Sequence, residues 1–349
     1  MRRPFALTVL IAVWVAASAQ AQDERMAGIE KTWAGRLVSE VNDLLARFHN
    51  PSSYDSAYIV RPDSWLTLKM RANLSGNSFH ARGTVNGVQS KADLYANNKM
   101  TVSFAVSYQG LSVAMALNPM KLFGSYQDYE LNVNFYSARF SLDASYQRAS
   151  SHSGDLQRSW AEGNGAEAGT DIFHLERGDA EMRVVNVAAY YAFNYRHFSY
   201  PAAFTQSYIQ RRSAGSWLTG LAFQGGTIGT GKEAPADMPD MQIKVAQLGV
   251  GVGYGYNLVV KDKWLFHLSA LPTTVVLNSG HLTVNGERRA AQPIRLNVIL
   301  NERFSVVYNF SPRYFTSLTG VMSNSIFDDN SLVINQNKWR VRAAFGIRL

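Results

Sequence analysis

From residue 65 to the end of this chain, apolar and polar side chains alternate at every second position in segment after segment. The last segment is the clearest case: its apolar residues are Trp339, Val341, Ala343, Phe345, Ile347 and Leu349, and its basic residues are Lys338, Arg340, Arg342 and Arg348. A period of two indicates a β-strand with two different faces. In a soluble sandwich the apolar face would cover a core, whereas in an outer-membrane barrel it meets lipid and the basic face lines a wet lumen.

The lengths of the connections distinguish these two architectures. Short reversals are predicted at 109–110, 137–138, 260–263 and 301–302, and long polar segments at 149–180, 225–242, 278–292 and 324–336. Short and long connections alternate along the chain, as in barrels with short periplasmic turns and long outer loops. The pattern predicts an all-β fold, a transmembrane antiparallel up-and-down β-barrel of about 12 strands. Ten or fourteen strands are the alternatives, because residues 75–98 do not divide clearly.

The first 21 residues have the composition of a signal peptide. Met1-Arg2-Arg3 is basic, residues 5–19 are almost entirely apolar, and Ala19-Gln20-Ala21 has the small residues that a signal peptidase reads. A membrane anchor is the alternative, but a spanning helix needs about 20 apolar residues. We therefore expect Sec-dependent export, cleavage between Ala21 and Gln22, and localisation in the outer membrane of a Gram-negative bacterium.

Residues 22–63 are predicted to form a periplasmic segment that precedes the barrel at 64–349. Between 23 and 50, apolar residues three or four apart predict a short amphipathic helix that ends at Asn50-Pro51. This helix would pack under the barrel, plug it, or bind a periplasmic partner. Residues 52–63 are expected to be an extended linker.

Two aromatic-rich strands at 190–217 flank Pro201, which fixes its own φ and has no N–H for a strand ladder. This predicts a hairpin with a turn at 198–205. Because the hairpin lies between two long outer loops, its turn is expected on the periplasmic side. The rings around the turn are then interpreted as part of an aromatic girdle at the lipid headgroups, formed by Tyr191, Tyr195, Phe198, Tyr200, Phe204 and Tyr208.

Charged residues opposite the apolar faces are predicted to line the lumen. The candidates are Lys69, Arg71, Glu130, Asp143, Arg211, Arg295, Arg340, Arg342 and Arg348. The chain has a formal net charge of +8, and such a lumen would attract small anions. Contact with lipopolysaccharide phosphates is a second interpretation of these cations. The competing interpretation is a solvated interior whose cations pair with Asp143, Glu130 and Glu181.

Residues for catalytic or cofactor chemistry are sparse. The chain has no cysteine, its seven histidines lack the spacing of a metal site, and we expect no cofactor, metal or nucleic-acid partner. His267-Leu268-Ser269 places a base and a nucleophile on one strand face, but the alternation turns both toward the lumen rather than toward lipid. Glycine at every second position from Gly249 to Gly255 leaves one strand face bare, which lets the sheet bend or a large group pack closely.

Several segments resemble one bacterial family. The central block comprises Tyr190-Tyr191-Ala192-Phe193-Asn194, Phe198-Ser199-Tyr200-Pro201-Ala202-Ala203-Phe204, Gln206-Ser207 and Gln210-Arg211-Arg212-Ser213-Ala214-Gly215-Ser216. It is similar to the signature of domain of unknown function 4421, a family of secreted proteins from Bacteroides-type bacteria. Tyr54-Asp55-Ser56-Ala57-Tyr58-Ile59 and residues 140–148 resemble other parts of that family. The resemblance implies an outer-membrane β-barrel and no established activity, so no catalytic residues follow from it.

Together these features predict a barrel that passes or binds small polar or anionic solutes. A non-conducting structural or assembly barrel with a filled lumen is the alternative, and a barrel-embedded lipid hydrolase is a third possibility. The expected partners are outer-membrane lipid and lipopolysaccharide and, through the C-terminal strand, the barrel-assembly machinery.

Overall fold

The computed structural model describes residues 54–62, 66–85, 88–108, 111–117, 129–150, 152–161, 168–231, 234, 238–290, 297–328 and 332–349. The predicted signal peptide and the predicted amphipathic helix at 23–50 lie outside these residues. Within the described part of the chain, no helix is long and apolar enough to cross a membrane.

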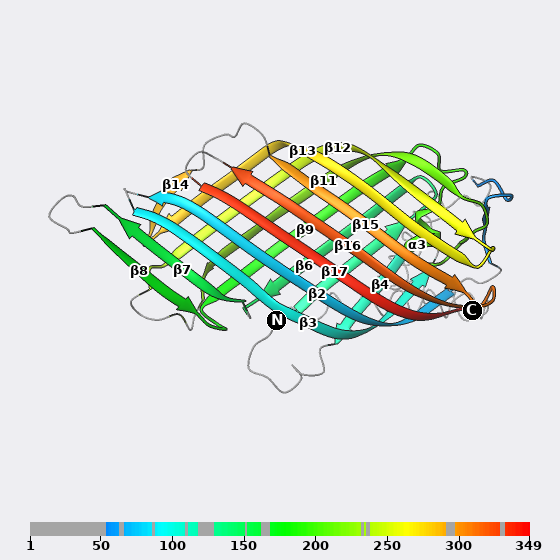
Figure 1. Ribbon diagram of the computed structural model, residues 1–349, viewed down its shortest axis with the longest axis horizontal. Helices are drawn as coiled ribbons and strands as arrows, with labels where there is room; N and C mark the ends of the chain where they lie inside the picture. The colour runs from blue at the N-terminus through cyan, green and yellow to red at the C-terminus, as the bar shows by residue number, and fades with distance from the viewer. Residues whose placement is uncertain are drawn as a thin grey trace, which may run out of the picture.

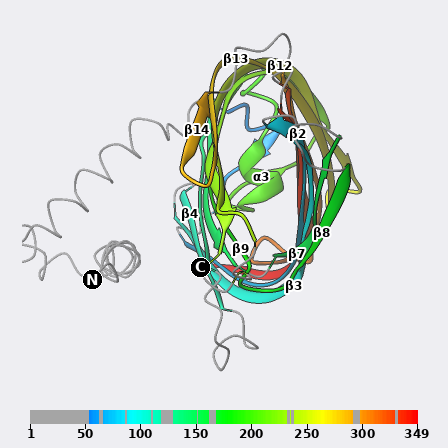
Figure 2. The ribbon, with the colours of Figure 1, turned by 90° about the vertical axis from the view of Figure 1, so that its left-hand side faces the viewer.

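Twelve of the described strands form one closed antiparallel ring (Figure 1, Figure 2). Each pairs with the next along the ring, and β17 pairs with β2 to close it, in a register that includes Arg348↔Thr67. The twelve are β2 (Leu66–Val85), β3 (Val88–Tyr108), β4 (Leu111–Leu117), β5 (Tyr129–Tyr136), β6 (Phe140–Ala149), β9 (Ala180–Ala192), β11 (Ala214–Thr230), β12 (Met241–Val260), β13 (Trp264–Val284), β15 (Val298–Asn309), β16 (Tyr314–Asp328) and β17 (Leu332–Arg348). The predicted barrel and its strand number are confirmed.

Three further strands widen the sheet at the end of the barrel away from the C-terminus (Figure 1). β7 (His152–Trp160) pairs with the first part of β3, and β8 (Gly169–Leu175) pairs with β7. β14 (Glu287–Ala290) pairs with the end of β13. The segment 75–98, which the sequence pattern does not divide clearly, belongs to the long hairpin of β2 and β3.

Two predictions about the connections are wrong. Asn301 and Glu302, predicted as a turn, lie within β15, where one faces the polar interior and the other faces outward. The segments predicted as long loops at 278–292 and 324–336 consist largely of strand, and the one predicted at 149–180 contains β7 and β8. In the segment predicted at 225–242, only residues 225–230 and 241–242 belong to strands, β11 and β12. In these stretches both strand faces carry polar residues, so the alternation that marks a strand in the sequence is lost.

The outward face of the barrel is apolar over the half that contains the C-terminus. Along β12 the exposed residues there are Val250, Val252, Tyr254, Tyr256 and Leu258, whereas Gln242 and Lys244 are exposed at the other end of the same strand. About ten residues of a tilted strand are enough to cross a bilayer. Since β12 has 20 residues, the molecule has the architecture of a transmembrane β-barrel whose wall continues beyond its apolar band.

The interior of the barrel is filled at both ends. Near the C-terminus, α3 (Tyr200–Phe204) lies inside the ring of strands (Figure 2). β1 (Ile59–Val60) and β10 (Ile209–Gln210) form a two-stranded sheet that packs with it, and we call this the plug end. Toward the opposite end, Phe79, Leu94 and Ile334 belong to a buried apolar cluster. A polar space lies between the two.

Candidate functional site

The connection between β9 and β11, residues 193–213, folds back into the barrel, and we call it the plug segment. Its helix α3 begins at the N-cap Ser199, whose Oγ accepts a hydrogen bond from the N–H of Ala202 at 3.1 Å. Pro201 occupies the first turn, where a helix needs no N–H from it. At the other end, Thr205 Oγ1 donates to Pro201 O at 3.0 Å, and Gln206 adopts a left-handed φ of 56°. The turn predicted at 198–205 is therefore a short helix that local hydrogen bonds stabilise.

Most of the predicted aromatic girdle lies inside the barrel. Phe198, Tyr200 and Tyr208 are 0%, 3% and 2% exposed, Pro201 is buried, and Phe204 is half-buried. The prediction that these residues meet lipid headgroups is therefore wrong. The physical reason is that the connection is long enough to fold inward, which removes its apolar rings from water.

The two remaining girdle candidates lie nearer the outer surface. Tyr191 packs against Phe140 with 5.2 Å between ring centroids. The guanidinium of Arg139 lies 4.3 Å from the ring centroid of Tyr195. The placement of these two rings is compatible with the prediction, which stays a prediction because membrane contact is a separate question.

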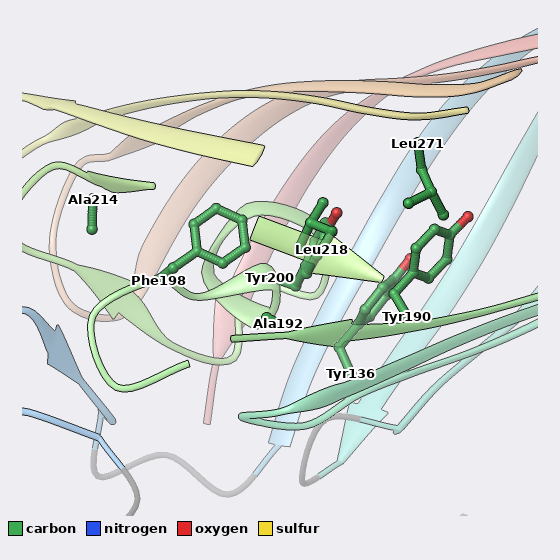
Figure 3. Close-up of a cluster of buried hydrophobic side chains, with 8 residues drawn as sticks. All are labelled: Tyr136, Tyr190, Ala192, Phe198, Tyr200, Ala214, Leu218 and Leu271. Atoms are coloured by element: carbon green, nitrogen blue, oxygen red, sulfur yellow. The ribbon is translucent and has the colours of Figure 1, made fainter. Parts of the chain in front are cut away.

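A buried aromatic cluster joins the plug segment to the wall (Figure 3). Phe198 and Tyr200 meet edge to face, with ring centroids 5.2 Å apart, and pack among residues of β5, β9, β11 and β13. Phe198 also lies on the bare face of β12, where a Cβ on Gly255 would be 2.9 Å from Phe198 Cζ. The expectation that a large group packs closely on the alternate glycines is confirmed at this position.

Two predicted lumen cations bind the C-terminal end of α3. Lys69 Nζ donates to Thr205 O at 3.0 Å, to Phe204 O at 3.3 Å and to Gln206 Oε1 at 3.0 Å. Arg348 Nε donates to Gln206 O at 2.6 Å, and its other two nitrogens each have an acceptor at 2.9 Å in the wall. The last carbonyls of a helix lack intrahelical partners and attract cations. Both cations are thus anchors of the plug segment.

A polar chain of hydrogen bonds links the other end of the plug segment to β12 and β13. Asn257 Nδ2 donates to Ser199 O at 3.0 Å, and Asn257 Oδ1 lies 2.7 Å from His267 Nδ1. Because an amide oxygen only accepts, Nδ1 carries the proton, and Nε2 accepts from Ser269 Oγ at 2.9 Å. Tyr200 OH donates to Ser269 Oγ at 3.3 Å. The wall and the helix therefore share one network.

The same residues form a Ser–His pair with a third group that orients the histidine. His267 and Ser269 are 3% and 4% exposed and face inward, as their alternation predicts. The rings of Phe198, Tyr200 and Phe204 cover the imidazole, with centroid distances of 5.8, 5.2 and 5.0 Å. Sequence reasoning missed Asn257, which lies on a different strand. The pair is enclosed by the plug segment and does not face the outer surface.

The end of the predicted linker packs against the plug segment. β1 pairs with β10 through Ile59↔Gln210, and the rings of Tyr54 and Tyr208 lie 4.9 Å apart. Burial raises the pKa of Tyr208 to about 12, while the positive charge of Arg61 opposes the rise. Residues 54–60 are thus held at the plug end by strand pairing and by aromatic contact.

Between the plug segment and the apolar cluster at the far end lies a chamber with about 130 Å³ of space for the centres of water-sized molecules. At roughly 10–15 Å³ for each water, this is room for on the order of ten. Phe204, Thr205 and Gln206 close it on the plug side. Its described basic lining residues are Lys69, Arg71, Arg303, Lys338, Arg340 and Arg342, and its described acidic lining residue is Asp143.

The carboxylate of Asp143 is occupied by its neighbours. It forms an ion pair with Arg303 and accepts hydrogen bonds from Tyr136 OH and Asn134 Nδ2. Arg303, 4% exposed, also donates to Tyr190 OH at 2.6 Å. Sequence reasoning missed Arg303 because a turn was predicted just before it. Continuing the period of two through β15 would have placed it on the inward face.

Three predicted lining residues meet in the chamber. Arg71, Arg340 and Arg342 come from the adjacent strands β2 and β17. Arg340 Nη1 donates to Asn132 Oδ1 at 2.8 Å. Arg71 is 7% exposed, and its Nε and Nη2 have no hydrogen-bond acceptor in the described protein.

The other predicted lining residues lie elsewhere. Arg211 is exposed at the plug end, where its N–H donates to Tyr58 O at 2.7 Å, so it is no part of the chamber. Arg295 and the side chain of Glu130 lie outside the described residues. Glu181, a predicted partner for lumen cations, pairs with Arg148 at 2.6 Å instead.

Comparison with solved structures finds several outer-membrane proteins. The outer membrane protease OmpT from Escherichia coli matches with a TM-score of 0.43 and 9% identity, over 82% of this chain and 97% of that one. The Pseudomonas putida toluene transporter TodX has a TM-score of 0.31 and 8% identity over 82% and 91% of the two chains. The translocator domain of the autotransporter NalP from Neisseria meningitidis has a TM-score of 0.30 and 11% identity over 98% and 99%.

Comparison with curated proteins finds no match. A family model, in contrast, matches residues 53–348, which is nearly the whole of the described chain. The resemblance seen in the central block is therefore confirmed over the entire barrel. The chain belongs to the family described as Domain of unknown function (DUF4421).

Proposed function

We propose that this protein resides in the outer membrane and binds a small anionic solute in its chamber, while the plug segment blocks passive flow. The observation that carries the proposal is the chamber inside the barrel, in which six described basic side chains face one carboxylate. The apolar band supports the membrane placement. Val252 and Phe345, for example, are 59% and 56% exposed on the outer surface, and lipid would cover them.

The charges of the chamber favour an anion over a cation. Arg71 lies opposite Ala344 and Arg342 lies opposite Asn73 in the β2–β17 register, so the two arginines are diagonal neighbours on one face. Like charges in a partly dry interior repel more strongly than in water. Asp143 is already paired with Arg303. A bound anion would offset the repulsion, and a cation would increase it.

The plug segment argues against free passage. Lys69 from β2 and Arg348 from β17 bind it on one side, and Ser305 Oγ of β15 donates to Ala203 O at 2.6 Å on another. A non-conducting structural or assembly barrel with a filled lumen is the second candidate, and the same closure favours it. The two candidates differ in whether the chamber binds an anion.

Lipid hydrolysis is the weakest candidate. His267 has the tautomer that a general base needs, but Ser269 lies beneath the plug segment, where an acyl chain in the membrane has no path to it. We expect Ser269→Ala to leave the acyl-chain composition of phospholipid and lipid A unchanged in expressing cells. A change in the acyl-chain composition that depends on Ser269 would support the lipid hydrolase.

The proposal is tested on the refolded mature chain, residues 22–349. In planar bilayers we expect no steady conductance, because the plug segment is seated. In detergent, isothermal titration calorimetry should detect binding of inorganic phosphate or acetate and no binding of choline, a cation of similar size. The double variant Lys69→Met/Arg348→Met should open an anion-selective conductance.

Each alternative outcome has a defined meaning. Cation-selective conductance of the unaltered chain would overturn the proposal. A closed barrel that binds neither anion would favour the structural candidate. Conductance that appears only when residues 23–50 are removed would assign the closure to that segment instead of the plug segment.

A further inference from the structure

We propose that Arg71 is the residue that grips the solute, and that the solute presents an oxyanion with two coplanar oxygens, a carboxylate or a phosphate. This inference rests on the proposed function, since it names the contact and the ligand chemistry of the same chamber.

The guanidinium of Arg71 has one edge that suits an oxyanion. Its Nε–H and one Nη2–H point in parallel from the edge away from the side-chain stem, and this edge matches two oxygens of a carboxylate or phosphate. In Arg71 both Nε and Nη2 lack an acceptor, although the side chain is only 7% exposed. Buried donors without acceptors are rare because leaving one unpaired destabilises the folded state. The edge that a carboxylate or phosphate would occupy is thus the edge that the described protein leaves unpaired.

Arg71 differs from two other buried arginines of the barrel. Arg348 Nε bonds to Gln206 O, and its Nη1 and Nη2 bond to wall acceptors. Arg303 binds the carboxylate of Asp143 and two tyrosine hydroxyls through Nη1 and Nη2, and only its Nε lacks an acceptor. Both side chains serve the protein itself. Arg71, in contrast, lines the chamber with its Nε and Nη2 unpaired, where an incoming ligand would meet it.

The charge and the size of the chamber suit a small anion. Arg342 lies diagonally across the β2–β17 pair from Arg71, and Arg340 follows on the same face. This surplus of positive charge suits an anion and disfavours an uncharged polar solute. A volume that holds on the order of ten waters suits a small organic acid or phosphate ester. Thr205 and Gln206 also line the chamber, so the ligand would lie against the plug segment.

The test compares Arg71→Lys and Arg71→Met with the unaltered mature chain. Lysine keeps the positive charge but lacks the two parallel N–H donors. The variant therefore distinguishes the contribution of the paired donors from that of the charge. We expect Arg71→Lys to weaken anion binding about tenfold or more, and Arg71→Met to weaken it further. Arg82→Lys, an exposed position on the same strand, is the matched control and should leave the affinity unchanged.

Inorganic phosphate and acetate are titrated separately, so that binding of one alone identifies the oxyanion. Heat-modifiable gel mobility shows whether each variant forms a barrel, and Arg71→Lys decides the question if Arg71→Met does not fold. If the unaltered chain binds and Arg71→Lys binds equally well, this inference is overturned and the proposed function stands. If the unaltered chain binds neither anion, the proposed function itself fails.

Discussion

The plug end and the chamber use basic side chains of the same two strands in opposite ways. On β2, Lys69 has three acceptors in the plug segment, whereas Arg71, two residues later on the same face, has an unpaired guanidinium edge. On β17, Arg348 bonds to three acceptors, whereas Arg342 lines the chamber. In the apolar–polar pattern of the sequence, all four are simply basic residues on the inward face of a strand. The anchors differ from the chamber cations in that the plug segment folds back to within hydrogen-bond reach of them.

The largest expected effect tests the anchors. In Lys69→Met/Arg348→Met, the carbonyls at the end of α3 lose their buried cationic donors, so the unfolding free energy should fall by about 3–5 kcal/mol. Urea unfolding followed by tryptophan fluorescence measures the loss. Arg82→Met, at an exposed position of β2, is the control and should change the value by less than about 0.5 kcal/mol. A double variant as stable as the control would break the distinction between the two regions.

The next effect tests the packing of the plug segment on the wall. Gly255→Val places side-chain atoms where Phe198 lies, since even a Cβ would come within 2.9 Å of the ring. Overpacking of this kind should cost about 1–3 kcal/mol and should loosen the closure. The same unfolding assay and bilayer conductance are the measurements. Gly255→Ala, with a smaller intrusion, should show a smaller change of the same sign. A fully stable, closed Gly255→Val barrel would show that Phe198 does not need this site.

Removing a cation from the chamber should not lower the unfolding free energy, in contrast to removing the anchors. Arg342→Met removes one of several neighbouring positive charges and anchors nothing in the plug segment. In the absence of an added anion, the unfolding free energy should stay level or rise by up to about 1 kcal/mol, because repulsion between the half-buried Arg342 and its like-charged neighbours is removed. At the same time, phosphate or acetate binding should weaken in calorimetry. A loss of stability as large as that of the anchor variant would merge the two regions into one structural role.

The smallest expected effect is a loss of stability at alkaline pH that arises from Tyr208 at the plug end. The pKa of Tyr208 is raised from 10.0 to about 12 by burial, so folding favours the neutral phenol. Its contribution is fully present below pH 10 and is lost as the pH rises toward 12. Tyrosinate absorbance during titration should show a late-ionising group that Tyr208→Phe removes. Anion binding in the chamber is the control measurement, because Tyr208 does not line the chamber, and Tyr208→Phe should leave it unchanged. If Tyr208→Phe retains every late-ionising step, the assignment to Tyr208 is contradicted.

Sequence reasoning worked best where one strand face is apolar. The pattern of β17 placed Arg340, Arg342 and Arg348 on the inner face, and that placement is seen. It worked poorly in two kinds of place. Beyond the apolar band both faces are polar, so the pattern predicts loops where the structure has strands. Inside β15, consecutive polar residues predict a turn, and the pattern therefore does not identify the inward-facing Arg303.

The plug segment exposes a different limit. Ser199, Pro201 and the aromatic residues around them are compatible with a turn at the membrane and with a helix in the lumen, because local chemistry is the same in both. Only contacts with distant strands separate the two. Lys69 and Thr205, for instance, are 136 positions apart in the chain. A hydrogen-bond partner that remote has no signature in local periodicity.

The sequence by itself therefore determined the strand period, the inward or outward face of each regular strand and the count of about 12, because side chains in a strand alternate whatever surrounds them. The tertiary structure alone decided which inward residues would be used and how. Folding of residues 193–213 into the barrel paired Lys69 and Arg348, enclosed His267 and Ser269, and left Arg71 facing a chamber. Burial and pairing are properties of the assembled interior, and no single strand contains them.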